Sequence, residues 1–227
     1  MTINEKTVIE EVGSPDIRLV HNFLTNEELE SFILDTQNPE DIWELNWENE
    51  YLGDAKKYTG WKGMCILLDK DEWLSRANLD KKKYNNLIAD VMSIVENKFN
   101  TKLKVESAQI TRWRIGRDQP PHIDYFIESE NHDYDELLEN NWTKELALEF
   151  AKDFHTKHYS AMLYLNDNFE GGDLYFPQHN NFTLRPEPGL LAIFQGNDNN
   201  FHGVTTVTNG IRYNISFFFT RIDHESK

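Results

Sequence analysis

Residues 201–219, FHGVTTVTNGIRYNISFFF, decide the fold class that this sequence predicts. Two stretches rich in β-branched and aromatic residues, 202–206 and 211–221, lie on either side of the dipeptide Asn209-Gly210. Such residues are enriched in strands, and Asn-Gly between two strand-like runs is a strong signal for a tight hairpin turn. The sequence therefore predicts a hairpin of two strands near the end of the chain.

Further strand-like segments precede this one and are separated by turns rich in Gly and Pro. They cover residues 105–115, 158–165, 173–176 and 190–194. Many short strands with such punctuation predict a sandwich or a barrel. Helices are expected earlier in the chain, over residues 80–99 and after Thr25, which forms a capping-box pattern with Glu28. The predicted class is α+β and mainly β.

The 227 residues are predicted to form a single domain. A helical and aromatic N-terminal part, residues 1–104, precedes a β-rich core, residues 105–222. Aromatic residues crowd the stretch 40–75, where they are interpreted either as core side chains or as a flap over a substrate. An acidic and then amphipathic insertion, residues 126–156, is interpreted either as a lid or as a surface elaboration.

The composition excludes several classes of function. The formal net charge is −16, from 39 acidic and 23 basic residues, so nucleic acid is a poor candidate partner. The one cysteine, Cys65, allows no disulfide within the chain and predicts a reducing, cytoplasmic setting. The first residues lack the apolar run of a secretory signal, and no apolar stretch is long enough to cross a membrane.

A metal site is predicted from three side chains. His122 and Asp124 are two residues apart, so on an extended segment both side chains point to the same side. His202 follows a predicted strand and a polar loop, and in a jelly roll such distant strands lie next to each other. Two imidazoles and one carboxylate on one face of an ion leave open positions, which is typical of non-haem Fe(II) oxygenases.

Arg212 lies ten residues after His202, just beyond the Asn209-Gly210 turn. Its guanidinium is a permanent cation with a planar fork of donors, which suits the distal carboxylate of a dicarboxylate such as 2-oxoglutarate. Taken alone, Arg212 is better interpreted as a surface residue; its spacing from His202 favours the cosubstrate role.

Three ordered motifs, QITRWRIGRDQPPHIDYF, YSAMLYLNDNFEGGDLYFP and FHGVTTVTNGIRYNISFFF, extend from Gln109 to Phe219. This region resembles the prolyl 4-hydroxylase-like branch of the Fe(II)/2-oxoglutarate-dependent dioxygenases, and HNFLTNEELESFI resembles the segment that opens the same domain. The resemblance implies a double-stranded β-helix, or jelly roll, supported by N-terminal helices. It also implies a shared reaction, in which O₂ and 2-oxoglutarate are consumed, succinate and CO₂ are released, and a C–H bond is hydroxylated.

The resemblance assigns roles to individual positions. It implies that His122, Asp124 and His202 hold Fe(II), and that Arg212 is the basic partner of 2-oxoglutarate. Tyr164 falls where a tyrosine often reaches the cosubstrate, and Ser160 takes the place of a small hydroxyl residue on the same strand. The resemblance further implies ascorbate, or vitamin C, as a reductant for the iron.

The sequence departs from the family pattern at four positions. Trp113 stands where a tyrosine that contacts 2-oxoglutarate is common, and Asn214 stands where a serine often follows the basic residue. Lys157 replaces an arginine, and Phe218 replaces a tryptophan at the border of the substrate site. The first two changes concern the cosubstrate pocket, and the last two concern the substrate.

The expected substrate is a prolyl residue of a protein or peptide, with Trp61, Phe126 and Phe218 lining its groove. The same reaction on a free amino acid, another side chain or a small metabolite is the second hypothesis. A jelly-roll binding module, with a structural metal or none, is the third, and the triad with Arg212 argues against it.

Overall fold

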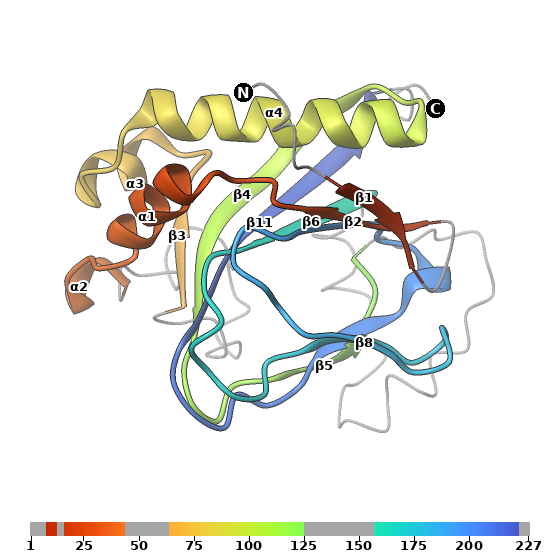
Figure 1. Ribbon diagram of the computed structural model, residues 1–227. Helices are drawn as coiled ribbons and strands as arrows, with labels where there is room; N and C mark the ends of the chain where they lie inside the picture. Colours follow the sequence, from red (N-terminus) through yellow and green to blue (C-terminus); the bar gives the residue numbers. More distant parts are fainter. Residues whose placement is uncertain (1–7, 13–15, 44–63, 125–156, 223–227) are drawn as a thin grey trace, which may run out of the picture.

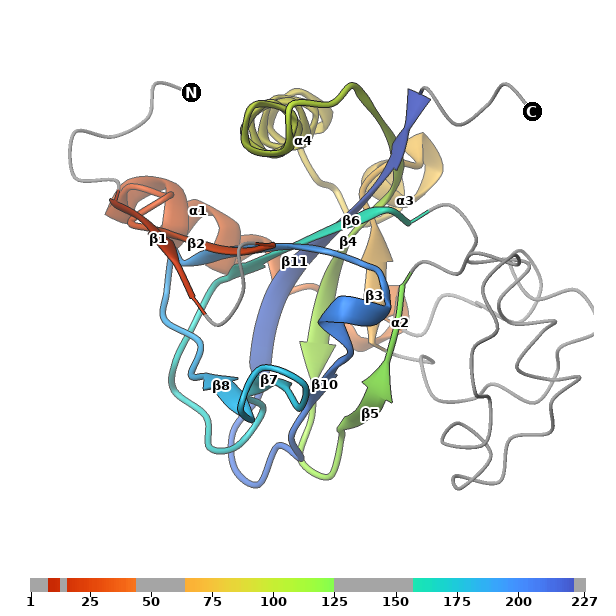
Figure 2. The same ribbon diagram turned by 90° about the vertical axis from the view of Figure 1, so that its right-hand side faces the viewer.

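The computed structural model describes residues 8–12, 16–43, 64–124 and 157–222. Two antiparallel β-sheets lie face to face, and a long helix covers the outer face of the larger sheet (Figures 1 and 2). This arrangement is the predicted mainly β fold, a two-sheet jelly roll supported by helices.

The large sheet is built around strand β11, which pairs with β4 on one side and β6 on the other. All its pairings are antiparallel. In spatial order its strands are β1 (Val8–Glu11), β2 (Ile17–His21), β9 (Leu191–Gln195), β6 (Tyr159–Tyr164), β11 (Arg212–Arg221), β4 (Leu103–Trp113) and β3 (Cys65–Leu67).

The small sheet has four short strands, which lie below the large sheet in Figure 1. Their spatial order is β5 (Gln119–His122), β10 (His202–Val204), β7 (Leu174–Phe176) and β8 (Phe182–Leu184). Strand β5 is an edge strand that contains Pro120 and Pro121. Proline has no N–H to donate, so an edge is where a sheet tolerates it.

The helices lie on the N-terminal side of the core. Helix α1 (Asn26–Asp35) begins at the predicted capping box, in which Glu28 N–H donates to Thr25 Oγ1 and Thr25 N–H donates to the Glu28 carboxylate. Helix α4 (Lys81–Phe99) confirms the predicted helix over residues 80–99. Two short helices, α2 (Glu40–Trp43) and α3 (Asp71–Arg76), complete the described set together with a 3₁₀ turn, η2 (Asp198–Asn200).

Two apolar layers hold these elements together. The first lies between the large sheet and the helices, where Val91 and Val95 of α4 join Ile215, Phe217 and Phe219 of β11. The second lies between the sheets and contains buried side chains from both, among them Tyr164, Ala192, Phe194, Leu174 and Phe176. Burial of apolar surface stabilises by about 25 cal/mol per Å². These two layers therefore fix the distance between the sheets, where the site lies.

One expectation from the sequence was wrong. Asn209-Gly210 does not join a hairpin, because β10 belongs to the small sheet and β11 to the large one. Instead Asn209 bridges to Glu170, whose N–H donates to its carbonyl at 2.9 Å, and Gly210 adopts a φ of 73° that carries the chain between sheets. The predicted helical and aromatic part, residues 1–104, also contributes β1, β2 and β3, which extend the large sheet.

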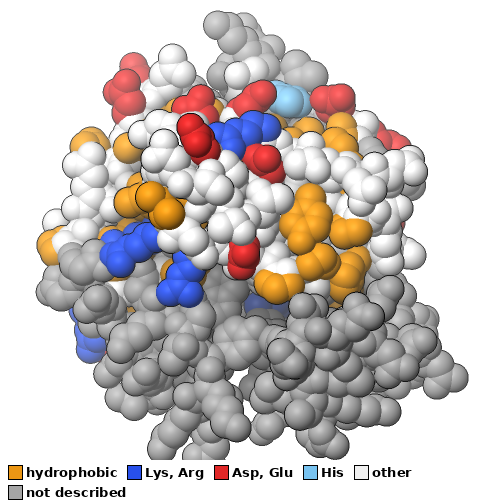
Figure 3. Space-filling view, turned by 90° about the horizontal axis from the view of Figure 1, so that it is seen from below, with side chains coloured by type: hydrophobic (Ala, Val, Ile, Leu, Met, Phe, Trp, Pro, Cys, Tyr) orange, Lys and Arg blue, Asp and Glu red, His pale blue; other side chains and the backbone are white. Residues whose placement is uncertain are grey.

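Figure 3 shows the molecule from below, where hydrophobic, acidic and basic side chains of the described residues are interspersed. Within the described ranges, none of the helices has the length and apolar character needed to cross a membrane.

Candidate metal centre

The two histidines of the predicted triad come from neighbouring strands of the small sheet. His122 ends β5 and His202 begins β10, and the two residues are directly paired in the antiparallel register. Their ring centroids are 4.4 Å apart. Edge strand β5 ends at His122, so the chain is free to turn toward the large sheet immediately afterwards.

Asp124 occupies that turn, and its backbone N–H donates to the Gly196 carbonyl at 2.9 Å. Its Oδ1 lies 3.6 Å from His122 Nε2, and its Oδ2 lies 3.5 Å from His202 Nε2. The three ligand atoms lie within 4.8 Å of one another. Asp124 and His202 are buried, whereas His122 is partly exposed. One ion can therefore contact all three side chains.

Backbone carbonyls set the tautomer of both imidazoles. His202 Nδ1 lies 2.9 Å from the Asn200 carbonyl, and His122 Nδ1 lies 3.0 Å from the Pro120 carbonyl. A carbonyl oxygen only accepts, so each Nδ1 carries the proton. The lone pair is then on Nε2, the atom that faces Asp124, which is the usual outer-sphere arrangement of a metal-binding histidine.

The charges of the cluster also suit a cation. Burial, followed by the neighbouring His122, lowers the pKa of His202 to about 4, so its imidazole is neutral at pH 7. Burial alone would raise the pKa of Asp124, but His202, His122, Lys157 and the Ser160 hydrogen bond together lower it. At neutral pH the cluster therefore offers the lone pair of His202 and the carboxylate of Asp124, beside the Nε2 of His122.

Ser160 lies at this carboxylate. Its Oγ donates to Asp124 Oδ2 at 2.5 Å, and both side chains are buried. This contact uses the only proton of the hydroxyl, so Ser160 orients the carboxylate from β6 in the large sheet. The resemblance also implies that Ser160 binds the cosubstrate, and that role stays a prediction.

Lys157 lies two residues before β6, next to the same cluster. Its Nζ lies 4.1 Å from the ring centroid of Phe218, which is a cation–π contact. Burial lowers the pKa of Lys157 to about 8, against the opposing pull of Asp124 and Glu106. Lys157 and Phe218, two of the departures from the family pattern, are therefore in contact beside the metal site.

Arg212 begins β11 and is buried between two aromatic rings. Its guanidinium carbon lies 5.0 Å from the Trp113 ring centroid and 5.2 Å from that of Tyr164. In the described part of the chain no carboxylate forms an ion pair with it, and Asp173, a nearby negative charge, pairs with Arg185 at 3.1 Å. A buried cation ordinarily has an anionic partner.

Within the described ranges, two buried polar atoms of Arg212 and its neighbour Tyr164 have no partner in hydrogen-bonding geometry. They are Arg212 Nε and the Tyr164 hydroxyl, which lies next to the guanidinium. Buried donors are nearly always satisfied in folded proteins. An anion with two oxygens, such as a carboxylate, would satisfy both atoms and the charge of Arg212. The pocket residues therefore fit the distal carboxylate of 2-oxoglutarate.

The other two predicted pocket residues bond to each other. Trp113 Nε1 donates to Asn214 Oδ1 at 3.0 Å, and Arg212 Nη1 donates to the same oxygen at 3.0 Å. Asn214 Nδ2 in turn donates to Ser216 Oγ at 2.8 Å. The two departures at the cosubstrate pocket thus form one hydrogen-bonded group with Arg212.

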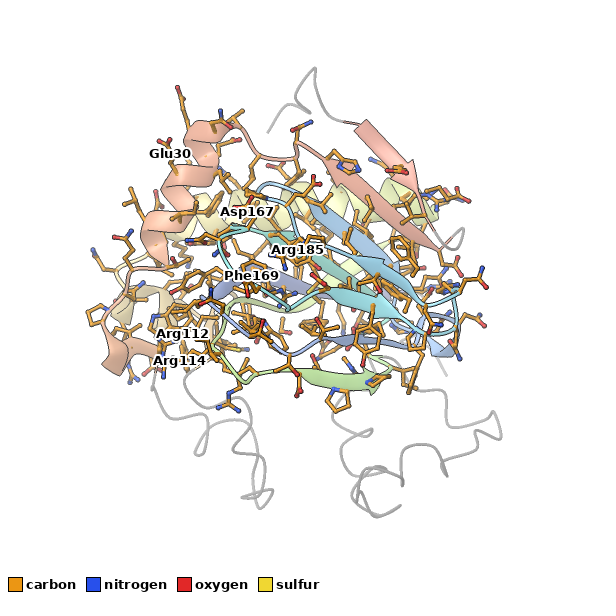
Figure 4. All side chains as sticks on the ribbon, turned by 60° about the horizontal axis from the view of Figure 1, so that its bottom comes forward. Glu30, Arg112, Arg114, Asp167, Phe169 and Arg185 are labelled. Atoms are coloured by element: carbon orange, nitrogen blue, oxygen red, sulfur yellow. The ribbon has the colours of Figure 1, made fainter. Side chains whose placement is uncertain are left out.

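Two glycines, Gly171 and Gly172, allow the loop before β7 to pack closely against the side chain of Arg212 and the backbone of Thr206. Gly172 has a φ of +67°, and a Cβ on it would lie 2.9 Å from Arg212 Cδ. A Cβ on Gly171 would lie 2.0 Å from the Thr206 carbonyl oxygen. Arg185 fastens this loop, donating to the carbonyls of Gly171 and Phe169 and lying over the Phe169 ring at 4.5 Å (Figure 4).

Sequence reasoning missed Asn200 and Gly196, which act through backbone carbonyls. A backbone carbonyl belongs to every residue, so neither position carries a sequence signal. Trp61, Phe126 and the insertion 126–156 lie outside the described residues.

A two-sheet jelly roll with a His–Asp–His cluster at one end is the arrangement of non-haem Fe(II) oxygenases. Residues 108–220, about half of the chain, match the family described as the 2OG-Fe(II) oxygenase superfamily. The chain belongs to this superfamily.

Part of this chain is similar in sequence to curated prolyl 3-hydroxylases. Prolyl 3-hydroxylase 3 of Mus musculus is 44% identical over 68 residues, which cover 28% of this chain and 9% of that protein. The chain thus spans about a tenth of the length of this curated relative.

Solved structures share the fold at low identity. A Trichoplax adhaerens prolyl hydroxylase in complex with a hypoxia inducible factor peptide fragment aligns with a TM-score of 0.60 at 16% identity, covering 92% of this chain and 85% of that one. A Pseudomonas putida prolyl-4-hydroxylase aligns with a TM-score of 0.56 at 14% identity, covering 91% and 92%.

Proposed function

We propose that this protein is an Fe(II)- and 2-oxoglutarate-dependent dioxygenase that hydroxylates an unactivated C–H bond. The observation that carries this proposal is the His122–Asp124–His202 cluster together with Arg212, a buried cation without a carboxylate partner in the described residues. A metal site with a purely structural role would not require a buried arginine that lacks a carboxylate partner.

The protein's part in the reaction follows from its own side chains. His122 and His202 present their Nε2 atoms, and Asp124 presents a carboxylate that Ser160 holds in place. These three side chains would hold Fe(II), which with the cosubstrate and O₂ would supply the oxidising chemistry. Arg212 and Tyr164 anchor the distal carboxylate of the cosubstrate and so fix which end faces the metal.

We propose a prolyl residue of a protein or peptide as the substrate. The support is the identity with prolyl 3-hydroxylases and the fold shared with prolyl hydroxylases, one of them in complex with a peptide. Some of these relatives are named prolyl 3-hydroxylases and one is named a prolyl-4-hydroxylase. Which proline carbon is hydroxylated is therefore to be determined by analysing the product. Phe218, with Lys157 over its ring, is the described side chain proposed to border the substrate.

We also propose a cellular compartment and a reductant for this reaction. A single cysteine suits a reducing compartment, for which the cytoplasm is the simplest candidate. Ascorbate is proposed as the reductant that returns iron oxidised in unproductive cycles to Fe(II).

An anaerobic titration tests the proposal. Purified protein receives Fe(II) and then 2-oxoglutarate, and the weak visible charge-transfer band of the chelate is recorded, with His122→Ala as the control. A band that needs both additions and is absent in the control supports an oxygenase site. A protein that shows no band and no 2-oxoglutarate turnover would instead be a non-catalytic jelly-roll module.

Proline-containing peptides and free proline are then offered in air, and mass spectrometry detects the addition of one oxygen atom. Asp124→Ala should abolish this product and leave the circular dichroism spectrum unchanged. Oxidation of free proline alone would move the substrate to the small-molecule class.

A further inference from the structure

We infer that Asn214 is a positioning residue, which holds Arg212 in the orientation that receives the cosubstrate carboxylate, and that Trp113 acts through Asn214. This inference rests on the proposed function, because it concerns the 2-oxoglutarate pocket. It assigns to the two departures from the family pattern a joint role that neither has alone.

The hydrogen bonds of Asn214 engage both polar atoms of its carboxamide. Its Oδ1 accepts from both Arg212 Nη1 and Trp113 Nε1, and its Nδ2 donates to Ser216 Oγ. The two donors fix which side of the carboxamide is the oxygen. The side chain is 1% exposed, so solvent offers it no other partner. Asn214 is therefore committed to protein contacts.

Arg212 depends on this oxygen for its orientation. The rings of Trp113 and Tyr164 flank the guanidinium at 5.0 and 5.2 Å, and ring contacts leave a flat cation free to turn between them. The bond from Nη1 to Asn214 Oδ1 is directional and stops that turn. Among the described residues, Arg212 Nε and the neighbouring Tyr164 hydroxyl remain without a partner in hydrogen-bonding geometry.

Trp113 secures the carboxamide from the neighbouring strand. It is the register partner of Arg212 across β4 and β11, so its indole reaches Asn214 from a fixed distance along the strand. Its ring also covers one face of the guanidinium. The chain of contact runs from Trp113 to Asn214 to Arg212, and removing Asn214 breaks both links at once.

Two variants of Asn214 separate positioning from packing. Asn214→Ala removes the restraint on Arg212, and the affinity for 2-oxoglutarate should fall by about tenfold, as for one lost hydrogen bond to a charged group. Asn214→Asp keeps the shape and both acceptor roles, and Ser216 can donate to the new oxygen. It also gives Arg212 a carboxylate of its own, which competes with the cosubstrate. The affinity of Asn214→Asp should fall by roughly a hundredfold or more, with no loss of thermal stability.

The role of Trp113 is tested in the same series. Trp113→Phe keeps an aromatic face over Arg212 but removes the indole N–H. Its effect on 2-oxoglutarate affinity should be a few-fold, and Trp113→Phe combined with Asn214→Ala should be no weaker than Asn214→Ala alone. Residues that act through one another give such non-additive effects.

The measurement is calorimetric binding of 2-oxoglutarate to Fe(II)-loaded protein without O₂, with Fe(II) affinity and metal-free melting temperature recorded for each variant. A second readout needs neither metal nor cosubstrate. The indole N–H signal that disappears in Trp113→Phe should exchange slowly with solvent in the wild type and quickly in Asn214→Ala.

The outcomes separate this inference from the proposed function. If the wild type binds 2-oxoglutarate and Arg212→Ala does not, while Asn214→Ala binds like the wild type, the positioning role is overturned and the function stands. If affinity falls only in parallel with melting temperature across the series, Asn214 is a packing residue and the inference is again overturned. If the wild type binds no 2-oxoglutarate, both fail.

Discussion

Replacing Arg212 by methionine should greatly lower the affinity for 2-oxoglutarate while changing the free energy of unfolding only slightly. Methionine keeps the unbranched stem of arginine as far as the position of Nε, but it lacks the guanidinium, carries no charge and donates no hydrogen bond. Removing one partner of a buried, hydrogen-bonded charge pair costs about 2–5 kcal/mol. At 1.4 kcal/mol per tenfold, the affinity for 2-oxoglutarate should fall by roughly 30-fold to 4,000-fold.

The metal-free protein should respond very differently. Burial of the Arg212 cation costs several kcal/mol. Two ring contacts, worth roughly 0.5–2 kcal/mol each, and the charged hydrogen bond to Asn214, worth roughly 1.5–3 kcal/mol, offset that cost. Because these terms nearly cancel, Arg212→Met should change the free energy of unfolding by less than about 2 kcal/mol.

The assay pairs anaerobic calorimetry of 2-oxoglutarate binding with urea unfolding of the metal-free protein. Arg117→Met is the matched control, since it removes the same charge from the loop between β4 and β5, away from the guanidinium pocket. Arg117→Met should bind 2-oxoglutarate as the wild type does. An Arg212→Met variant that binds within threefold of the wild type would refute the assignment of Arg212 as the anchor.

Three other predictions concern the surroundings of the site. Ser160→Ala leaves Asp124 Oδ2 without its donor and should weaken metal binding by roughly 10- to 100-fold, whereas Ser160→Thr should retain most of the affinity; calorimetry with Mn²⁺ compares them. Gly172→Ala places a Cβ against Arg212 at a positive φ and should destabilise the protein by about 1–3 kcal/mol, visible as a lower melting temperature, together with weaker 2-oxoglutarate binding. Because the pKa of His202 is lowered to about 4 in the folded state, the folded protein binds fewer protons than the unfolded chain between pH 4 and about 6.5, and the metal-free protein should lose stability as the pH falls through that window. His202→Gln should flatten this dependence, and an unchanged slope in that variant would contradict the assignment.

The strand pattern of the core could be read from the sequence because its segments are short, apolar and separated by Gly and Pro. Strands β4, β6, β7, β9 and β11 all begin and end within two residues of the predicted ranges. The partners of these strands could not be read in the same way. Asn209-Gly210 has the local chemistry of a hairpin, yet the carbonyl of Asn209 is used by Glu170 and the chain crosses to the other sheet. Tertiary hydrogen bonds there outweigh the local preference.

The residues of the candidate site were found because their side-chain chemistry is rare and their spacing is ordered. His122, Asp124 and His202 are brought together by the pairing of β5 with β10. The contacts that orient them were not predictable. Ser160 reaches Asp124 only because β6 lies opposite the end of β5, and the proton on each histidine is set by a backbone carbonyl. Such contacts depend on the distances between strands, and these distances cannot be predicted from a sequence pattern.

The side chains of strand β11 alternate between the candidate site on one face of the large sheet and the apolar core on the other. Arg212, Asn214 and Ser216 are linked by hydrogen bonds on the side of the proposed cosubstrate pocket, whereas Ile215 and Phe217 pack in the layer beneath the helices. A mutation on one face is therefore judged by ligand binding and a mutation on the other by folding, although the two are neighbours in the chain. This separation lets the pocket change its chemistry in small steps while the domain remains folded. An engineer who wishes to alter cosubstrate preference would do best to vary the even-numbered positions and leave the odd ones alone.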